Sequence, residues 1–266
     1  MMMVTKADIF ACLEALDIKK SDKLTVHSSL KSIGEIEGGA EGLLDALCEY
    51  LSDGLLIIPS HTWDNISQTR FFDVRSTPAC TGVLSRIATA RADGARSLHP
   101  THSVVVFGKG NEDYVRGEEF RTSTPNPPSG CLGRLYDVGG KILLLGVGHE
   151  RNTFLHSVDE RLKIKNRISK DSIAITMKDH NGKEVAVPEF HWYETPGVDE
   201  GVSEFYGNYE EALRYCGAAL YSTLGNATAI CCDAKKSVEV IASLWEKADY
   251  DLCAIKKAVP REYYEK

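Results

Sequence analysis

Long apolar runs are missing from this sequence of 266 residues. The longest are short stretches such as Leu55–Pro59 and Ile142–Val147, whereas a membrane-spanning helix needs about 18 or more consecutive apolar residues. The N-terminus also lacks a basic segment followed by an apolar one, so we expect no signal peptide. These absences predict a cytoplasmic protein without membrane contact.

An excess of positive charge is also absent, because 31 basic side chains stand against 38 acidic ones, for a formal net charge of −7. Nucleic-acid-binding proteins usually present a basic face to phosphates, so nucleic acid is not an expected partner. The acidic balance suits a cationic small molecule, although solubility alone also favours it. The eight cysteines include no Cys-x-x-Cys pair, which predicts reduced core side chains.

Short apolar strands alternate with amphipathic helical stretches along the chain. This alternation predicts an α/β protein with a central, largely parallel sheet flanked by helices. Capping residues place helix starts at Thr5 and Asp233. Segment 173–187, with Asn181-Gly182 near its middle, predicts a β-hairpin in the C-terminal half. Neither a repeat nor a long linker is evident, so we expect one composite domain over residues 1–266. The predicted strands are 24–26, 55–58, 104–107 and 142–145.

The loop after strand 142–145 carries the densest set of reactive side chains. His156 and Asp159 are three residues apart, so on a helix they would lie on one face. A carboxylate beside an imidazole fixes its tautomer and stabilises the imidazolium that forms during base catalysis. Thr153 lies one turn earlier and can bond to the histidine or to the reacting group. The three form a candidate general-base site, although the spacing alone slightly favours a packed structural histidine.

Other kinds of site fit the sequence less well. Gly146 and Gly148 start a dinucleotide-binding pattern, but Arg151 occupies its third glycine position. A Rossmann-type, nicotinamide-dependent oxidoreductase therefore remains only an alternative. No metal is expected, because the candidate ligands match no standard zinc spacing. Those ligands are His99, His102, His149, His156 and Asp159.

Several segments, taken in order, resemble one known family. They are Val26–Gly34, Gly38–Ala40, Leu55–Trp63, Arg96–Ser103, Lys141–Gly146 and Asn152–His156, with a weaker similarity at Gly225–Ala227. Together they resemble the aminoglycoside 3-N-acetyltransferases over nearly the whole chain. The resemblance implies an acetyl-CoA-dependent N-acetyltransferase whose α/β fold differs from that of GCN5-type acetyltransferases. It also implies direct transfer of the acetyl group to an amine. Besides the oxidoreductase, a non-catalytic CoA-binding protein of the same fold is the second alternative to this function.

The resemblance further implies roles for individual residues. The family's catalytic histidine falls on His156, and its acidic partner, most often glutamate, falls on Asp159, with Glu160 adjacent. Charge, rather than the resemblance, suggests that Trp63, Asp64 and Glu194 bind the amine acceptor, an aminoglycoside-like or other cationic small molecule, because carboxylates attract cations. The oligomeric state is left unassigned. The residues implied to contact acetyl-CoA are His27, Ser28, Ser29, Lys31, Ser97, Thr101 and Ser103.

Overall fold

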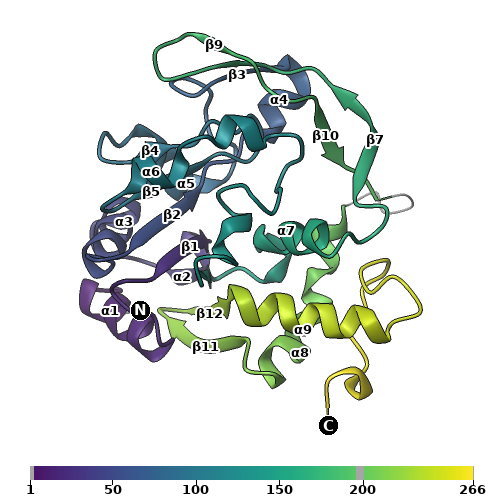
Figure 1. Cartoon of the computed structure of the whole chain (residues 1–266). Coiled ribbons are helices and arrows are strands. Elements are labelled where there is room, and N and C mark those ends of the chain that lie inside the picture. Colours follow the sequence, from purple (N-terminus) through teal and green to yellow (C-terminus); the bar gives the residue numbers. More distant parts are fainter. Residues whose placement is uncertain (1–2, 196–200, 266) are drawn as a thin grey trace.

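The computed structural model describes residues 3–195 and 201–265 (Figure 1). Its main sheet has the strand order β11-β12-β6-β1-β2-β5-β4. The strands of this sheet are β1 (Lys23–Ser28), β2 (Leu55–Pro59), β4 (Ala95–Arg96), β5 (Val104–Phe107), β6 (Lys141–Leu145), β11 (Ala219–Leu224) and β12 (Ala227–Asp233).

The parallel part of the main sheet is its centre, where β1 pairs in parallel with both β6 and β2. The outer strands pair antiparallel with their neighbours. Short connections explain this direction for the two outermost pairs, since Gly225-Asn226 joins β11 to β12 and residues 97–103 join β4 to β5. Gly225 has a φ of 58°, which glycine adopts without steric cost. The expected α/β architecture is confirmed, with antiparallel strands added at both edges.

Helices cover both faces of the main sheet (Figure 1). Because side chains alternate along a strand, Leu143 and Leu145 of β6 pack toward α1, α3 and α5, whereas Ile142 and Leu144 pack toward α7, α8 and α9. Central strands that are buried on both faces read as unbroken apolar runs, which is why the sequence reveals them. These helices are α1 (Lys6–Ala15), α3 (Gly39–Tyr50), α5 (Gly82–Ala90), α7 (Phe154–Arg161), α8 (Glu210–Tyr215) and α9 (Ala234–Lys247).

Both predicted helix caps are confirmed. The Thr5 side chain accepts a hydrogen bond from Asp8 N, and the Asp8 side chain accepts one from Thr5 N. Asp233 caps α9 by accepting from Lys236 N at 2.9 Å. The shorter helical segments are α2 (Leu30–Ile33), α4 (Trp63–Thr69), α6 (Asn111–Val115), η1 (Glu118–Arg121), η2 (Gly133–Leu135), η3 (His149–Arg151), η4 (Val202–Tyr209) and η5 (Arg261–Tyr263).

Two small sheets lie beyond the main one. The predicted hairpin is confirmed for β8 and β9, which pair antiparallel around Asn181-Gly182. Its first predicted residue, Ile173, belongs instead to β7, which pairs with β10. That pairing brings β10 toward α7 (Figure 1). The strands are β3 (Phe71–Asp73), β7 (Ile168–Ile173), β8 (Thr176–Lys178), β9 (Glu184–Val185) and β10 (Phe190–Tyr193).

The cysteines are all free, as expected. Five of them are buried, Cys48 and Cys80 are half-buried, and Cys216 is exposed. The prediction of core positions is therefore confirmed for the five buried side chains, Cys12, Cys131, Cys231, Cys232 and Cys253.

Candidate active site

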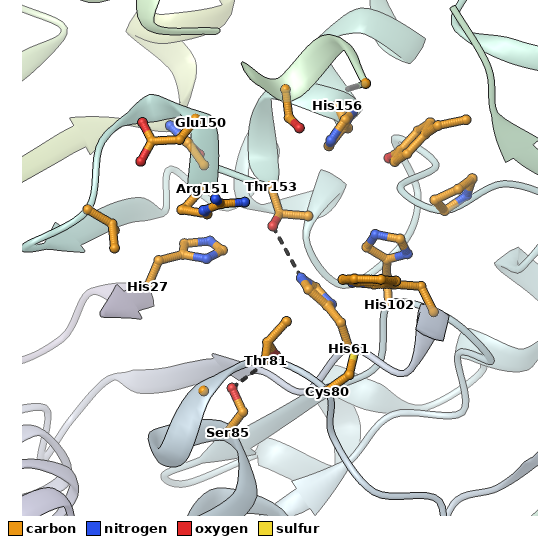
Figure 2. Close-up of a pocket in the computed structure, with 18 of the residues that line it drawn as sticks. His27, His61, Cys80, Thr81, Ser85, His102, Glu150, Arg151, Thr153 and His156 are labelled. Carbon is orange, nitrogen blue, oxygen red and sulfur yellow. Dashed lines mark hydrogen bonds between the residues drawn. The ribbon is translucent and has the colours of Figure 1, made fainter. Parts of the chain in front are cut away.

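A cavity of about 810 Å³ lies at the carboxyl edge of the parallel strands. Its wall includes Ser28 at the end of β1, His61 in the loop after β2, and Thr153 in the loop after β6. Adjacent parallel strands end at the same edge of a sheet, so loops that are far apart in sequence converge there. Figure 2 shows side chains from these loops pointing into one space.

His156 lies on α7 and lines this cavity. Its ring stacks on Tyr193 of β10, with the centroids 3.9 Å apart and the planes 15° from parallel. Its Nδ1 lies 2.9 Å from the Tyr206 hydroxyl oxygen. Among the described residues Nε2 has no hydrogen-bond partner, so this nitrogen is the one available to a molecule in the cavity.

Tyr206 determines which nitrogen of His156 carries the proton. The tyrosine hydroxyl donates to Asp159 Oδ2 at 2.9 Å, and a phenol has only one proton to give. While Asp159 is ionised, the hydroxyl oxygen therefore accepts from His156 Nδ1–H, which leaves Nε2 without a proton. The expectation that Asp159 contacts His156 directly needs correction, because Tyr206 stands between them.

Burial and charge set the ionisation of this group. Burial, assisted by the positive charge of Arg167, lowers the pKa of His156 to about 3, so the imidazole is neutral at physiological pH. Burial raises the pKa of Asp159 to about 6, although the charge of Arg167 and the hydrogen bond from Tyr206 oppose that rise. At neutral pH the pair consists of a neutral histidine and a carboxylate, the states that base catalysis requires.

The adjacent residue Glu160 has a different role. It accepts hydrogen bonds from the Thr124 hydroxyl at 2.6 Å and from Asn126 N at 3.2 Å. Burial raises the pKa of this carboxyl to about 7. Glu160 thus holds the loop that precedes η2 against α7, and Asp159 is the residue linked to His156.

Thr153 extends the polar wall of the cavity. Its hydroxyl lies 3.2 Å from His61 Nε2 (Figure 2). The His61 ring packs against that of His102, with centroids 4.5 Å apart. Burial lowers the pKa of both histidines well below the usual value, so both are neutral. Around Thr153 the cavity therefore offers uncharged hydrogen-bonding groups.

The residues expected to contact CoA separate into two groups. His27 and Ser28 line the cavity. Ser29 instead caps α2, where its hydroxyl lies 2.8 Å from that of Ser32, and Lys31 is exposed on α2 outside the cavity wall.

Three hydroxyls of the 97–103 connection need correction as CoA contacts. Ser97, Thr101 and Ser103 are each 0% exposed, so they have no surface to offer a ligand. Ser97 accepts from Val104 N, Thr101 bonds to His102 Nδ1, and Ser103 donates to Ser60 O. Their hydrogen bonds join the loops behind the cavity, and none of the three side chains forms part of the cavity surface.

Two of the three residues expected to bind the acceptor line the cavity, and the third does not. Trp63 and Glu194 line the cavity, and Trp63 is 44% exposed. Asp64 is exposed in the first turn of α4 and is not part of the wall. Two aromatic residues of β10, Trp192 and Tyr193, add to the same side of the cavity.

Sequence reasoning missed the residues that complete the site. Tyr206, Tyr193 and His61 come from three separate elements, and no local spacing links them to His156. Arg167, which donates from Nε to Asp159 Oδ2 at 3.0 Å, was missed for the same reason.

Two further observations concern the described residues 3–195 and 201–265. No group of three or more His, Cys, Asp or Glu side chains in them is arranged to hold a metal ion. No helix in this part of the chain is both long and apolar enough to cross a membrane.

Comparison with known proteins identifies the family of this chain. The family model described as aminoglycoside 3-N-acetyltransferase matches residues 25–246. The chain belongs to this family. Its members are acyltransferases, and acetyl-CoA is the co-substrate that fits them.

Two curated relatives illustrate the family. The SPbeta prophage-derived aminoglycoside N(3')-acetyltransferase-like protein YokD of Bacillus subtilis (strain 168) is 28% identical over 210 residues, which cover 70% of this chain and 76% of the relative. Aminoglycoside N(3)-acetyltransferase IV of Salmonella sp is 31% identical over 162 residues, or 60% of each chain.

Solved structures show the same fold. A binary complex of AAC-IIIb with CoASH aligns with a TM-score of 0.77 and 20% identity, over 92% of this chain and 97% of that one. A mutant of aminoglycoside acetyltransferase AAC(3)-IVa in complex with a gentamicin aligns with a TM-score of 0.76 and 23% identity, over 96% and 98% of the two chains.

Proposed function

We propose that this chain transfers the acetyl group of acetyl-CoA directly to an amine of a small cationic acceptor, with His156 as general base. The observation that carries the proposal is the pair of hydrogen bonds through Tyr206, which keep His156 Nε2 unprotonated beside the cavity. A structural histidine needs no such fixed tautomer facing open space.

The proposed reaction begins with acetyl-CoA and an amine bound together in the cavity. The amine nitrogen attacks the thioester carbonyl carbon, and His156 Nε2 takes up the proton that the nitrogen loses. The carbon–sulfur bond then breaks, and the imidazolium returns its proton to the CoA thiolate. Asp159 stabilises the transient imidazolium through Tyr206. Base catalysis of this kind contributes about 10²–10⁴-fold, and holding both substrates together supplies much of the remainder.

Two features of the wall support a CoA-binding role. His27 Nε2 is buried and, within the described part of the chain, has no hydrogen-bond partner, so a ligand amide can satisfy it. Arg151 also lines the cavity, and its side chain is 61% exposed. Figure 2 shows both side chains directed at the same part of the cavity. Arg151 therefore replaces Lys31 as the proposed partner of a CoA phosphate.

Two groups support a cationic acceptor. Glu194 and Trp63 line the cavity, so they offer a carboxylate and an aromatic face that attract ammonium groups. A solved structure of similar fold, in complex with a gentamicin, agrees with an amine-bearing small molecule. We therefore propose that the acceptor binds on this side of the cavity and CoA on the side of β1.

The function is tested first by thermal unfolding with acetyl-CoA, CoA and NADP⁺. We expect both CoA compounds to raise Tm, because a ligand at 100 times its Kd stabilises the folded state by about 2.7 kcal/mol. NADP⁺ should leave Tm unchanged. A rise with NADP⁺ alone would favour the oxidoreductase alternative. Stabilisation by CoA without acetyl transfer to any amine would favour the non-catalytic one.

The pH dependence of turnover should reflect Asp159. Its pKa, raised by burial to about 6, means that the carboxylate is present above that pH and is lost below it. Once protonated, Asp159 no longer needs the Tyr206 proton, and His156 loses its fixed tautomer. We therefore expect kcat to fall as the pH decreases through about 6, in a profile recorded with saturating substrates. A flat profile through that range would contradict this assignment.

A further inference from the structure

The hydrogen bonds that begin at His156 continue past Asp159 to the segment that follows α9. Arg167 is only 2% exposed and lies between two carboxylates. Its Nε donates to Asp159 Oδ2 at 3.0 Å, while its two terminal nitrogens donate to the two Asp251 oxygens at 2.8 Å each. The fork of the guanidinium thus joins Asp251 to Asp159 with fixed geometry.

A second set of contacts ties the same segment to the element that carries Tyr206. Asn208, two residues after Tyr206 in η4, donates from Nδ2 to Leu252 O and Ile255 O at 2.8 Å each. Its Oδ1 accepts from Lys257 N at 2.9 Å. Residues 251–257 are therefore bound both to Arg167 and to η4, the two supports of the Tyr206–Asp159 pair.

We propose that Asp251 is a positioning residue for the catalytic base, acting through Arg167, Asp159 and Tyr206 on the tautomer of His156. The proposal rests on the function proposed above for His156. Asp251 lies after residue 246, where the match to the family model ends, so family membership assigns it no role.

The physical argument concerns the direction of the Arg167 guanidinium. A buried cation needs partners for its donors, and bonds to charged groups are among the strongest in proteins. Without the Asp251 carboxylate the terminal nitrogens lose their two short, charged bonds, and Nη1 keeps only the longer ones to Lys165 O at 3.3 Å and Asn166 O at 3.4 Å. The guanidinium is then held less firmly and can turn away from Asp159. Asp159 then loses the cation that favours its ionised form, and Tyr206 becomes free to donate its proton to His156 Nδ1. That reversal would place the imidazole proton on Nε2 and remove the base.

The test compares Asp251→Asn with Asp249→Asn, which removes the same charge from an exposed residue of the same segment. The Asp251 side chain is 31% exposed, so its replacement by the isosteric amide should be tolerated. We expect kcat to fall about 10-fold in Asp251→Asn with the KM for acetyl-CoA within about twofold, and both constants to stay within about twofold in Asp249→Asn.

The second readout is the ¹⁵N chemical shifts of the His156 ring. The parent protein and Asp249→Asn should show a protonated Nδ1 and an unprotonated Nε2, and Asp251→Asn a mixture of tautomers. Unchanged kcat and an unchanged tautomer in Asp251→Asn would overturn the proposal, as would an equal loss of kcat in Asp249→Asn.

Arg167→Lys gives an independent test if Asp251→Asn does not fold. Lysine keeps the charge but cannot bond both carboxylates through a planar fork, so the same tautomer mixture and loss of kcat are expected. A folded Arg167→Lys protein with parental kcat and tautomer would refute the link. If His156→Ala itself retains turnover, the proposed function fails; if only the Asp251 and Arg167 variants behave like the parent, the positioning role alone fails.

Discussion

His156→Ala should abolish acetyl transfer while leaving the affinity for acetyl-CoA nearly unchanged. The substitution removes the group that accepts the amine proton, and general bases contribute about 10²–10⁴-fold to turnover. The imidazole is only half-buried against the cavity, so CoA contacts made at the end of β1 should persist. Steady-state kinetics would give kcat, and calorimetric titration would give the Kd of acetyl-CoA.

A matched control is His191→Ala. His191 lies on β10, is half-buried and bonds through Nδ1 to Ser169 O, but it is not part of the cavity wall. It should keep kcat within about twofold of the parent value. A folded His156→Ala protein with near-parental kcat would end the proposed mechanism. Loss of the fold on His156→Ala would instead assign the histidine a structural role.

Tyr206→Phe has the second largest expected effect, a fall of about 10–100-fold in kcat. Tyr206 is fully buried, and phenylalanine keeps its ring packing while removing the hydroxyl that joins His156 to Asp159. His156 then loses the acceptor for its Nδ1 proton, and either tautomer becomes possible. The free energy of unfolding should fall by about 1–3 kcal/mol, since buried groups lose a partner. Kinetics and denaturant unfolding measure the two effects separately.

Tyr209→Phe is the control for this prediction. Tyr209 lies in the same 3-10 segment and is equally buried. Its hydroxyl accepts from Trp245 Nε1 at 2.8 Å and from Cys253 Sγ at 3.2 Å, and it bonds to neither His156 nor the carboxylates bound by Arg167. It should lose similar stability but keep kcat. If both variants lose turnover equally, the effect comes from disturbing η4 and the relay through Tyr206 is refuted.

The central strands and the caps could be predicted from the sequence because their signals are local. Leu143 and Leu145 are buried on one face of β6, while Ile142 and Leu144 are buried on the other, so the strand reads as one apolar run. Asp233 marks the start of α9 because its side chain accepts a hydrogen bond from the backbone N–H of Lys236, three residues later. The direction of β5 could not be predicted, because an apolar run looks alike whether its neighbour is parallel or antiparallel.

The candidate site was only partly predictable. His156 and Asp159 share a helix, so their spacing reveals them, but Tyr206 lies 50 residues from His156 and reaches it only through the fold. Arg167 and Asp251 are 84 residues apart, so they too meet only in the folded chain. Hydroxyls near a strand end are equally suited to bind a ligand or to satisfy buried backbone. Ser97 and Ser103 bond to buried backbone groups, and only their burial in the folded chain shows that they are not ligand contacts.

The most direct test of the central claim is the release of free CoA thiol from acetyl-CoA, measured with and without amines and paired with quantification of the acetylated product. The amines should include aminoglycosides and simpler cationic amines. The account predicts that thiol release depends on the amine, equals the acetylated product mole for mole, and disappears in His156→Ala. Absence of amine-dependent release with every acceptor, from a folded protein that binds acetyl-CoA, would contradict it.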